Sequence, residues 1–149
     1  MTKLLKEQFL KLIELGPLVS IDLIVRCEEK YLLGHRKNKP AKDFWFVPGG
    51  RILKNETLED AFCRLTEVEL NTAFQIDDGG FKGVYQHFYD NSAISDSVST
   101  HYVVLAYVLE MDNRDFSLTN VQHDSWQWLT QDEIVNSDNV HSYTKAYFI

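Results

Sequence analysis

The chain has 149 residues, of which 44% are hydrophobic and 13% aromatic, with only seven glycines and three prolines. This composition predicts one globular domain over residues 1–149 and excludes a disordered or fibrous protein. No apolar run reaches the roughly 18 residues that a membrane-spanning helix needs, and the N-terminus lacks the unbroken apolar core of a signal peptide. We therefore expect a cytoplasmic protein that does not bind a membrane.

Acidic residues outnumber basic ones by 22 to 15, and the formal net charge of −7 argues against a nucleic-acid partner. The charge is uneven, because six of the seven charged residues between His35 and Lys54 are basic. Such a stretch suits a small anionic ligand, although a solvated lysine face explains it equally well. Two cysteines, Cys27 and Cys63, predict neither a disulfide framework nor a metal site.

Hydrophobic periodicity predicts a helix within residues 1–16, which Gly16-Pro17 should stop with a left-handed cap. A hairpin turn is expected at residues 28–30. Residues 103–109 are apolar at every position, so their strand should be central and covered on both faces. Strands are predicted, in order, at residues 19–25, 31–36, 45–47, 81–89, 101–111 and 126–129.

Thr57 and Asp60 have the spacing of a capping box that opens a helix. An apolar stripe then recurs at helical spacing and should point one carboxylate inward, through Leu58, Phe62, Leu65 and Glu69. Residues 130–133 should open a short helix, and residues 140–149 should form the last one. This element order predicts the α+β class, with a mixed sheet flanked by helices.

After the Pro-Gly-Gly turn, the sequence reads Gly50-x5-Glu56-x7-Arg64, with Glu69 five residues later. This pattern resembles the Nudix box, G-x5-E-x7-R-E-U-x-E-E-x-G-U, in which U is a bulky apolar residue. A loop–helix segment of this kind points carboxylates at a divalent cation that holds a nucleoside diphosphate, and Mg²⁺ prefers such oxygen ligands. Three positions depart from the box, where Leu65, Val68 and Asn71 replace Glu, Glu and Gly. Asparagine at the helix end also tolerates the left-handed cap conformation.

One Nudix subfamily, the GDP-mannose mannosyl hydrolases (GDP-mannose glycosyl hydrolases), shares these losses of box carboxylates. The chain resembles it from Pro17 to Phe148 in eight ordered blocks. The blocks are PLVSIDLIV (17–25), LLGHRKNKPA (32–41), WFVPGGR (45–51), ETLEDAFCRLT (56–66), GVYQHFYDN (83–91), THYVVL (100–105), QHD (122–124) and SDNVH (137–141).

The resemblance implies a Nudix fold, with a mixed β-sheet sandwiched between α-helices, and Mg²⁺-dependent hydrolysis of GDP-mannose. Attack at C1 of the sugar, with inversion, would give GDP and free mannose. That reaction needs one metal ion to neutralise the leaving group, which accounts for the missing carboxylates. GDP-glucose stays open as a further substrate.

The resemblance also implies roles for individual residues. The metal ligands would be the backbone carbonyl of Gly49 and the side chains of Glu69 and Gln122. His123 would be the general base, since imidazole titrates near neutral pH, and Arg36 would stabilise the departing GDP. The alternatives are an exposed helix glutamate, a surface glutamine and a solvated loop histidine.

Asp22 interrupts an apolar strand, where an unpaired buried carboxylate would be costly, so we assign it to catalysis as a substrate ligand or an arginine partner. Arg51, His87 and Tyr102 match subfamily positions that line the substrate site, with sheet packing or surface charge as the alternative. Subfamily members are homodimers in which the N-terminal segment crosses to the partner. That crossing would bring Phe9 against guanine.

Glu56 and Arg64 are expected to pair and to fix the loop that carries Gly49. Two other functions remain open. An ordinary Nudix pyrophosphatase would give GMP and mannose 1-phosphate, but the missing box carboxylates argue against it. A non-catalytic sugar-nucleotide sensor would have no reason to retain Gln122 and His123.

Overall fold

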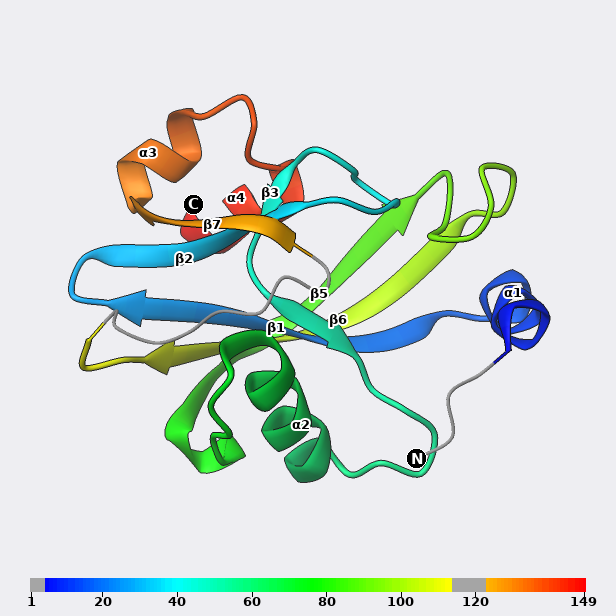
Figure 1. The fold of residues 1–149 in the computed structure, drawn as a ribbon, viewed down its shortest axis with the longest axis horizontal. Coiled ribbons are helices and arrows are strands. Elements are labelled where there is room, and N and C mark those ends of the chain that lie inside the picture. Colours follow the sequence, from blue (N-terminus) through cyan, green and yellow to red (C-terminus); the bar gives the residue numbers. More distant parts are fainter. Residues whose placement is uncertain (1–4, 114–122) are drawn as a thin grey trace.

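A mixed seven-stranded sheet forms the centre of the protein (Figure 1). The computed structural model describes residues 5–113 and 123–149, with residues 123 and 124 described by their backbone alone. The strands are β1 (Leu18–Cys27), β2 (Lys30–Arg36), β3 (Trp45–Phe46), β4 (Gly49–Arg51), β5 (Gly79–Tyr89), β6 (Thr100–Glu110) and β7 (His123–Thr130). The helices are α1 (Lys6–Leu15), α2 (Leu58–Leu70), α3 (Gln131–Asn136) and α4 (Ser142–Lys145), with 3₁₀ turns η1 (Ile76–Asp78) and η2 (Ala146–Phe148).

The main path of the sheet runs β3-β2-β1-β6-β5, with β4 paired to β1 and β7 paired to β2. β1 and β6 are parallel, whereas the other strand pairs among the described residues are antiparallel. The register places Asp22 of β1 beside Ala106 of β6 on one side and beside Gly49 of β4 on the other.

Helices cover both faces of this sheet, as the predicted α+β arrangement requires. Figure 1 shows α2 below the sheet, and α3 with the C-terminal segment above it. Phe62 of α2 packs into a core with Leu109 of β6. On the opposite face, Ile134 of α3 and Phe148 of η2 pack with Ala106 of the same strand. β6 therefore contributes to both cores, which confirms the prediction that it is covered on both faces.

The structure differs from the predictions in three local details. α1 ends before Gly16, but this residue is extended (φ −169°) rather than left-handed, because the following proline disfavours a helical conformation before it. Leu58 belongs to the predicted inward stripe, yet it is 41% exposed in the first turn of α2. Residues 49–51 form β4 instead of a simple turn. Asn71 does cap α2 in the left-handed conformation (φ 55°), as expected.

Two further features concern the length of the helices and the state of the cysteines. None of the helices in residues 5–113 and 123–149 is long and apolar enough to cross a membrane. Cys27 and Cys63 are both free, in agreement with the absence of a disulfide framework.

Candidate active site

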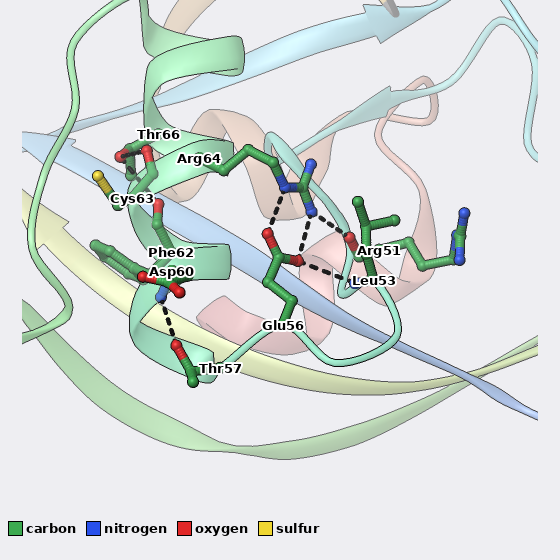
Figure 2. A network of polar contacts seen from close by, with 9 residues as sticks. All are labelled: Arg51, Leu53, Glu56, Thr57, Asp60, Phe62, Cys63, Arg64 and Thr66. Carbon is green, nitrogen blue, oxygen red and sulfur yellow. Dashed lines mark hydrogen bonds and ion pairs between the residues drawn. The ribbon is translucent and has the colours of Figure 1, made fainter. Parts of the chain in front are cut away.

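A partly buried ion pair between Glu56 and Arg64 fixes the loop between β4 and α2 (Figure 2). The Glu56 side chain is 1% exposed, and its Oε2 accepts a hydrogen bond from Arg64 Nε at 2.7 Å. Glu56 Oε1 also accepts from the backbone N–H of Leu53 at 2.9 Å, and Arg64 Nη2 donates to the carbonyl oxygen of Arg51 at 2.7 Å. The hydrogen bond from Arg64 holds the pKa of Glu56 below its usual range. The predicted pairing is confirmed, and it ties α2 to the end of β4.

Glycine is required where β4 passes between β1 and α2. A Cβ atom at Gly49 would lie 2.3 Å from the carbonyl oxygen of Ile21, and one at Gly50 would lie 2.5 Å from a methyl carbon of Leu65. Both distances are shorter than a carbon atom tolerates, so a side chain at either position would push the neighbouring segments apart. The absence of side chains therefore lets the backbone of Gly49 lie directly beside Asp22.

A cavity of about 510 Å³ opens beside this strand, a size common for small-molecule sites. Residues from α1, from strands β1 to β6 and from the loops after β2, β3 and β5 surround it. Seven residues that the sequence nominated for the site line the cavity: Phe9, Asp22, Arg36, Gly49, Arg51, His87 and Tyr102. The structure thus brings together side chains that are up to 93 positions apart in the sequence.

The remaining nominated residues lie around or beyond this cavity. Glu69 is not part of its lining, but its side chain is buried on α2, within electrostatic range of Asp22 and Arg36. His123 pairs with Arg36 across the β2–β7 register, so β7 brings its backbone to the end of β2. The side chain of His123 and the whole of Gln122 lie outside the described residues.

Asp22 has a hydrogen-bond partner that the sequence did not reveal. Tyr147 of η2 donates its hydroxyl to Asp22 Oδ2 at 2.5 Å. Burial raises the pKa of the Asp22 carboxyl to about 6, although the hydrogen bond from Tyr147 and the positive charge of Arg36 act to lower it. The carboxylate is therefore partnered, as an acid within an apolar strand must be.

The two arginines of the cavity are held by different neighbours. Arg36 Nε donates to the carbonyl oxygen of Pro40 at 3.0 Å, and its guanidinium lies 5.8 Å from the centre of the Phe46 ring. The guanidinium of Arg51 lies 5.2 Å from the centre of the Phe9 ring in the same chain. Two oriented guanidinium groups suit a diphosphate, since each can offer parallel N–H donors to phosphate oxygens.

The β5 side of the cavity is aromatic. His87 stacks on Tyr143 with ring centres 4.3 Å apart and planes 5° from parallel. Burial and the nearby His141 lower the pKa of His87 to about 4, so its ring is neutral near physiological pH. Tyr89, two residues along the same strand, also lines the cavity. Strand periodicity could have nominated Tyr89, because residues i and i+2 share a face.

The donor set expected for a metal differs from a carboxylate cluster. Among the side chains that the structure describes, which exclude those of residues 123 and 124, no group of three or more His, Cys, Asp or Glu could hold a metal ion. The two described members of the expected set are the Gly49 carbonyl and Glu69. Burial raises the pKa of Glu69 to about 7, which Arg36 opposes and Asp22 reinforces. A divalent cation would favour the charged form of this carboxylate, so these oxygen donors fit one hard cation.

Comparison with known proteins shows the family to which this chain belongs. A family model described as NUDIX domain matches residues 16–148. The chain therefore belongs to the Nudix family, and the predicted Nudix fold is confirmed. Membership supports hydrolase activity on a nucleoside diphosphate derivative, with a divalent metal ion as the usual cofactor.

Two relatives and two solved structures illustrate the similarity. The chain is 42% identical over 107 residues to the low-salt glycan biosynthesis protein Agl8 of Haloferax volcanii, covering 72% of this chain and 67% of that protein. It is 39% identical over 64 residues to an ADP-ribose pyrophosphatase of Methanocaldococcus jannaschii, covering 42% of this chain and 38% of that protein. The MutT NUDIX hydrolase of Burkholderia pseudomallei superposes with a TM-score of 0.72 at 22% identity, over 89% of this chain and 96% of that one. The MutT protein of Methanosarcina mazei Go1 gives 0.71 at 17% identity, over 90% and 92%.

Proposed function

We propose that this Nudix protein hydrolyses GDP-mannose at C1 of the sugar, with inversion, and releases GDP and free mannose. The observation that supports this most is the grouping of Asp22, Arg36 and Arg51 around one cavity, beside a Nudix box that keeps Glu69 alone of its paired glutamates. One Mg²⁺ ion per subunit, at Gly49, Glu69 and Gln122, would neutralise charge on the diphosphate when bound.

The state of the box positions favours attack at carbon over attack at phosphorus. Leu65 stands where the box has the glutamate that directly follows its arginine, and it packs against Gly50 in the core. Val68 stands at the first of the paired glutamates and is 40% exposed to solvent. Hydrolysis at phosphorus in this family's box relies on several carboxylates around metal ions, whereas departure of GDP from C1 needs its negative charge stabilised.

The protein's own groups can supply that stabilisation and the proton transfer. Arg36, oriented by the Pro40 carbonyl, and Arg51 would pair with the diphosphate as it leaves. His123 would take a proton from the attacking water, on the face of the sugar opposite to the diphosphate. Asp22 would hold sugar hydroxyls, since it lines the cavity next to Gly49.

The named relatives bear on the substrate in two ways. Agl8 is described as a glycan biosynthesis protein, and a nucleotide sugar is the substrate class that such a role uses. The pyrophosphatase relative supports a second candidate, cleavage of a nucleotide sugar to GMP and sugar 1-phosphate. That similarity covers 42% of the chain, and the lost box carboxylates argue against it.

We also propose a homodimer. Helix α1 exposes Leu12 and Leu15, and its N-cap residue Leu5 is exposed as well, as expected of a helix that packs on a second copy. Phe9 lies on the same helix and lines the cavity, so packing of α1 at a dimer interface would fix the cavity wall near the nucleotide.

One labelling experiment tests the reaction. The protein is incubated with GDP-mannose and Mg²⁺ in ¹⁸O-water, and the products are identified with the position of the label. We expect labelled mannose, unlabelled GDP, and a sugar that appears first as the β anomer in proton NMR. Labelled GMP or labelled mannose 1-phosphate would favour the pyrophosphatase, and binding without turnover would favour the sensor. The Glu69→Gln variant, prepared identically, controls for contaminating hydrolases.

A further inference from the structure

The C-terminal segment sends one tyrosine hydroxyl to the edge of the candidate active site. Tyr147 is 4% exposed, and its hydroxyl donates to Asp22 Oδ2 at 2.5 Å across 125 positions of sequence. Asp22 lines the cavity, whereas Tyr147 is not part of that lining. The hydroxyl can therefore influence a bound molecule through the carboxylate that it contacts, without touching the molecule itself.

Packing fixes the donor in one place. The Tyr147 ring meets Tyr85 edge to face, with ring centres 4.7 Å apart, and lies 6.4 Å from His87. It belongs to the core that α3 and η2 form on this face of the sheet. These contacts restrict the rotation of a ring that is almost fully buried, so its hydroxyl holds a defined position against Asp22.

The two oxygens of the Asp22 carboxylate are consequently distinguished. Oδ2 is occupied by the hydroxyl of Tyr147. Oδ1 lies on the side of Gly49, 2.8 Å from the point where a Cβ on that residue would stand. A carboxylate held through one oxygen presents the other in a set direction, and the side chain loses no further rotational freedom when a ligand binds.

We propose that Tyr147 is a positioning residue, which holds the Asp22 carboxylate in the orientation that binds the sugar of the substrate. This inference rests on the proposed function in one respect, the assignment of Asp22 to the sugar. Tyr147 would act on binding and turnover of a nucleotide sugar and would leave binding of the bare nucleoside diphosphate unchanged, because the diphosphate contacts belong to Arg36 and Arg51.

The main test compares Tyr147→Phe with Tyr107→Phe. Tyr107 is a buried tyrosine in the opposite core and does not line the cavity, so its variant controls for general loss of a buried hydroxyl. We expect kcat for GDP-mannose to fall about 10- to 100-fold in Tyr147→Phe, the scale of a misplaced catalytic contact, and to stay unchanged in Tyr107→Phe. Thermal unfolding of both variants separates this effect from loss of fold.

A double variant shows whether Tyr147 acts through Asp22. In the Asp22→Asn background, adding Tyr147→Phe should have almost no further effect on kcat, because the group that it orients is already altered. Fully additive losses would overturn the inference, as would a Tyr147→Phe protein that folds and keeps kcat within twofold of wild type.

Unnatural residues at position 147 keep the test decisive if phenylalanine disturbs the fold. 4-Aminophenylalanine retains the ring and a hydrogen-bond donor, and we expect it to restore kcat. 4-Methylphenylalanine fills the same volume without a donor, and we expect it to behave like phenylalanine. Equal activity of the two proteins would contradict a positioning role.

Binding measurements separate failure of this inference from failure of the proposed function. In the His123→Ala background, calorimetry should show that Tyr147→Phe weakens GDP-mannose binding several-fold and leaves GDP binding unchanged. Equal affinities for GDP-mannose with and without the hydroxyl would overturn the positioning role. If the wild-type protein binds GDP-mannose but does not cleave it at C1, the proposed reaction is wrong, and the ratio of the two affinities still decides the role of Tyr147.

Discussion

On the β4–α2 side of the cavity, ionic contacts hold the backbone in place, whereas on the β5 side stacked rings do. Glu56 and Arg64 form a partly buried ion pair at the end of β4, and Glu69 lies on α2 together with Arg64. Opposite them, neutral His87 stacks on Tyr143. Formal charge is thus concentrated on the β4–α2 side, where we propose that a cation binds, and neutral rings occupy the β5 side. The comparison predicts that charge removal will be far more harmful on one side than on the other.

The largest expected effect is on the charged side, at Glu69. Glu69→Gln should abolish most turnover and also the rise in melting temperature that Mg²⁺ produces, because a carboxamide is a weaker ligand for a hard cation. Without metal, burial raises the pKa of Glu69 from 4.5 to about 7, so the fold loses stability as pH rises from 4.5 to 7, and the loss is complete above this range. At pH 8 the metal-free variant should therefore be more stable than wild type, by on the order of 3 kcal/mol.

Glu67→Gln is the matched control for this prediction, since Glu67 is exposed on the same helix. It should leave turnover and the Mg²⁺-induced shift unchanged. Near-normal turnover of Glu69→Gln in Mg²⁺ would show that the metal assignment is wrong.

The next effect concerns the general base. Removing the imidazole of His123 should lower kcat by about 10²- to 10⁴-fold, and the rise of the rate with pH through a histidine ionisation should disappear. His87 cannot supply that rise near neutral pH, because burial lowers its pKa to about 4. His87→Gln should therefore keep the ascending limb, measured as kcat against pH, even if its KM changes. A limb that persists in His123→Ala would move the role to another group.

The smallest effects compare two ion pairs in urea unfolding. Glu56→Gln removes the buried carboxylate of a partly buried pair, and we expect a loss of about 2 kcal/mol in the free energy of unfolding. Asp96→Asn breaks the ion pair with Lys39, a residue that lines the cavity. Because Asp96 is 81% exposed, the loss in the free energy of unfolding should stay below about 1 kcal/mol. Equal losses would mean that burial does not separate the two pairs.

The pH dependence of the larger loss has a definite sign. The pKa of Glu56 is lowered in the fold, so the stability that it contributes is present above its unfolded pKa of 4.5 and is lost as pH falls below that value. The difference between wild type and Glu56→Gln should therefore shrink under acid conditions.

Local signals predicted the pieces of this fold better than their assembly. Thr57 caps α2 as its sequence indicates, and the spacing of Glu56 and Arg64 was enough to predict their pairing. The family resemblance nominated residues that the sheet does gather around one cavity, while their roles stay predictions. Periodicity carries no information on which strands become neighbours, so the parallel pairing of β1 with β6 could not be predicted from it.

The contact between Asp22 and Tyr147 escaped prediction for the same reason. It joins residues 125 positions apart, and no motif in the last segment marks Tyr147 as facing a strand near the start of the chain. At Gly16 the error was local, since the proline that follows determined the conformation.

The parallel pairing of β1 and β6 also has a kinetic consequence. β1 lies between β2 and β6, and its partner residues in β6 come 84 positions later in the chain, as in the pair Leu18 and Tyr102. Contacts of such high sequence separation form late and slowly, because the entropy cost of closing a long loop comes before the contacts stabilise the chain. The cavity takes walls from both strands, so it exists only once the sheet has closed. Partly folded chains should therefore lack it, and ligands that bind it should select the completed fold and slow global unfolding.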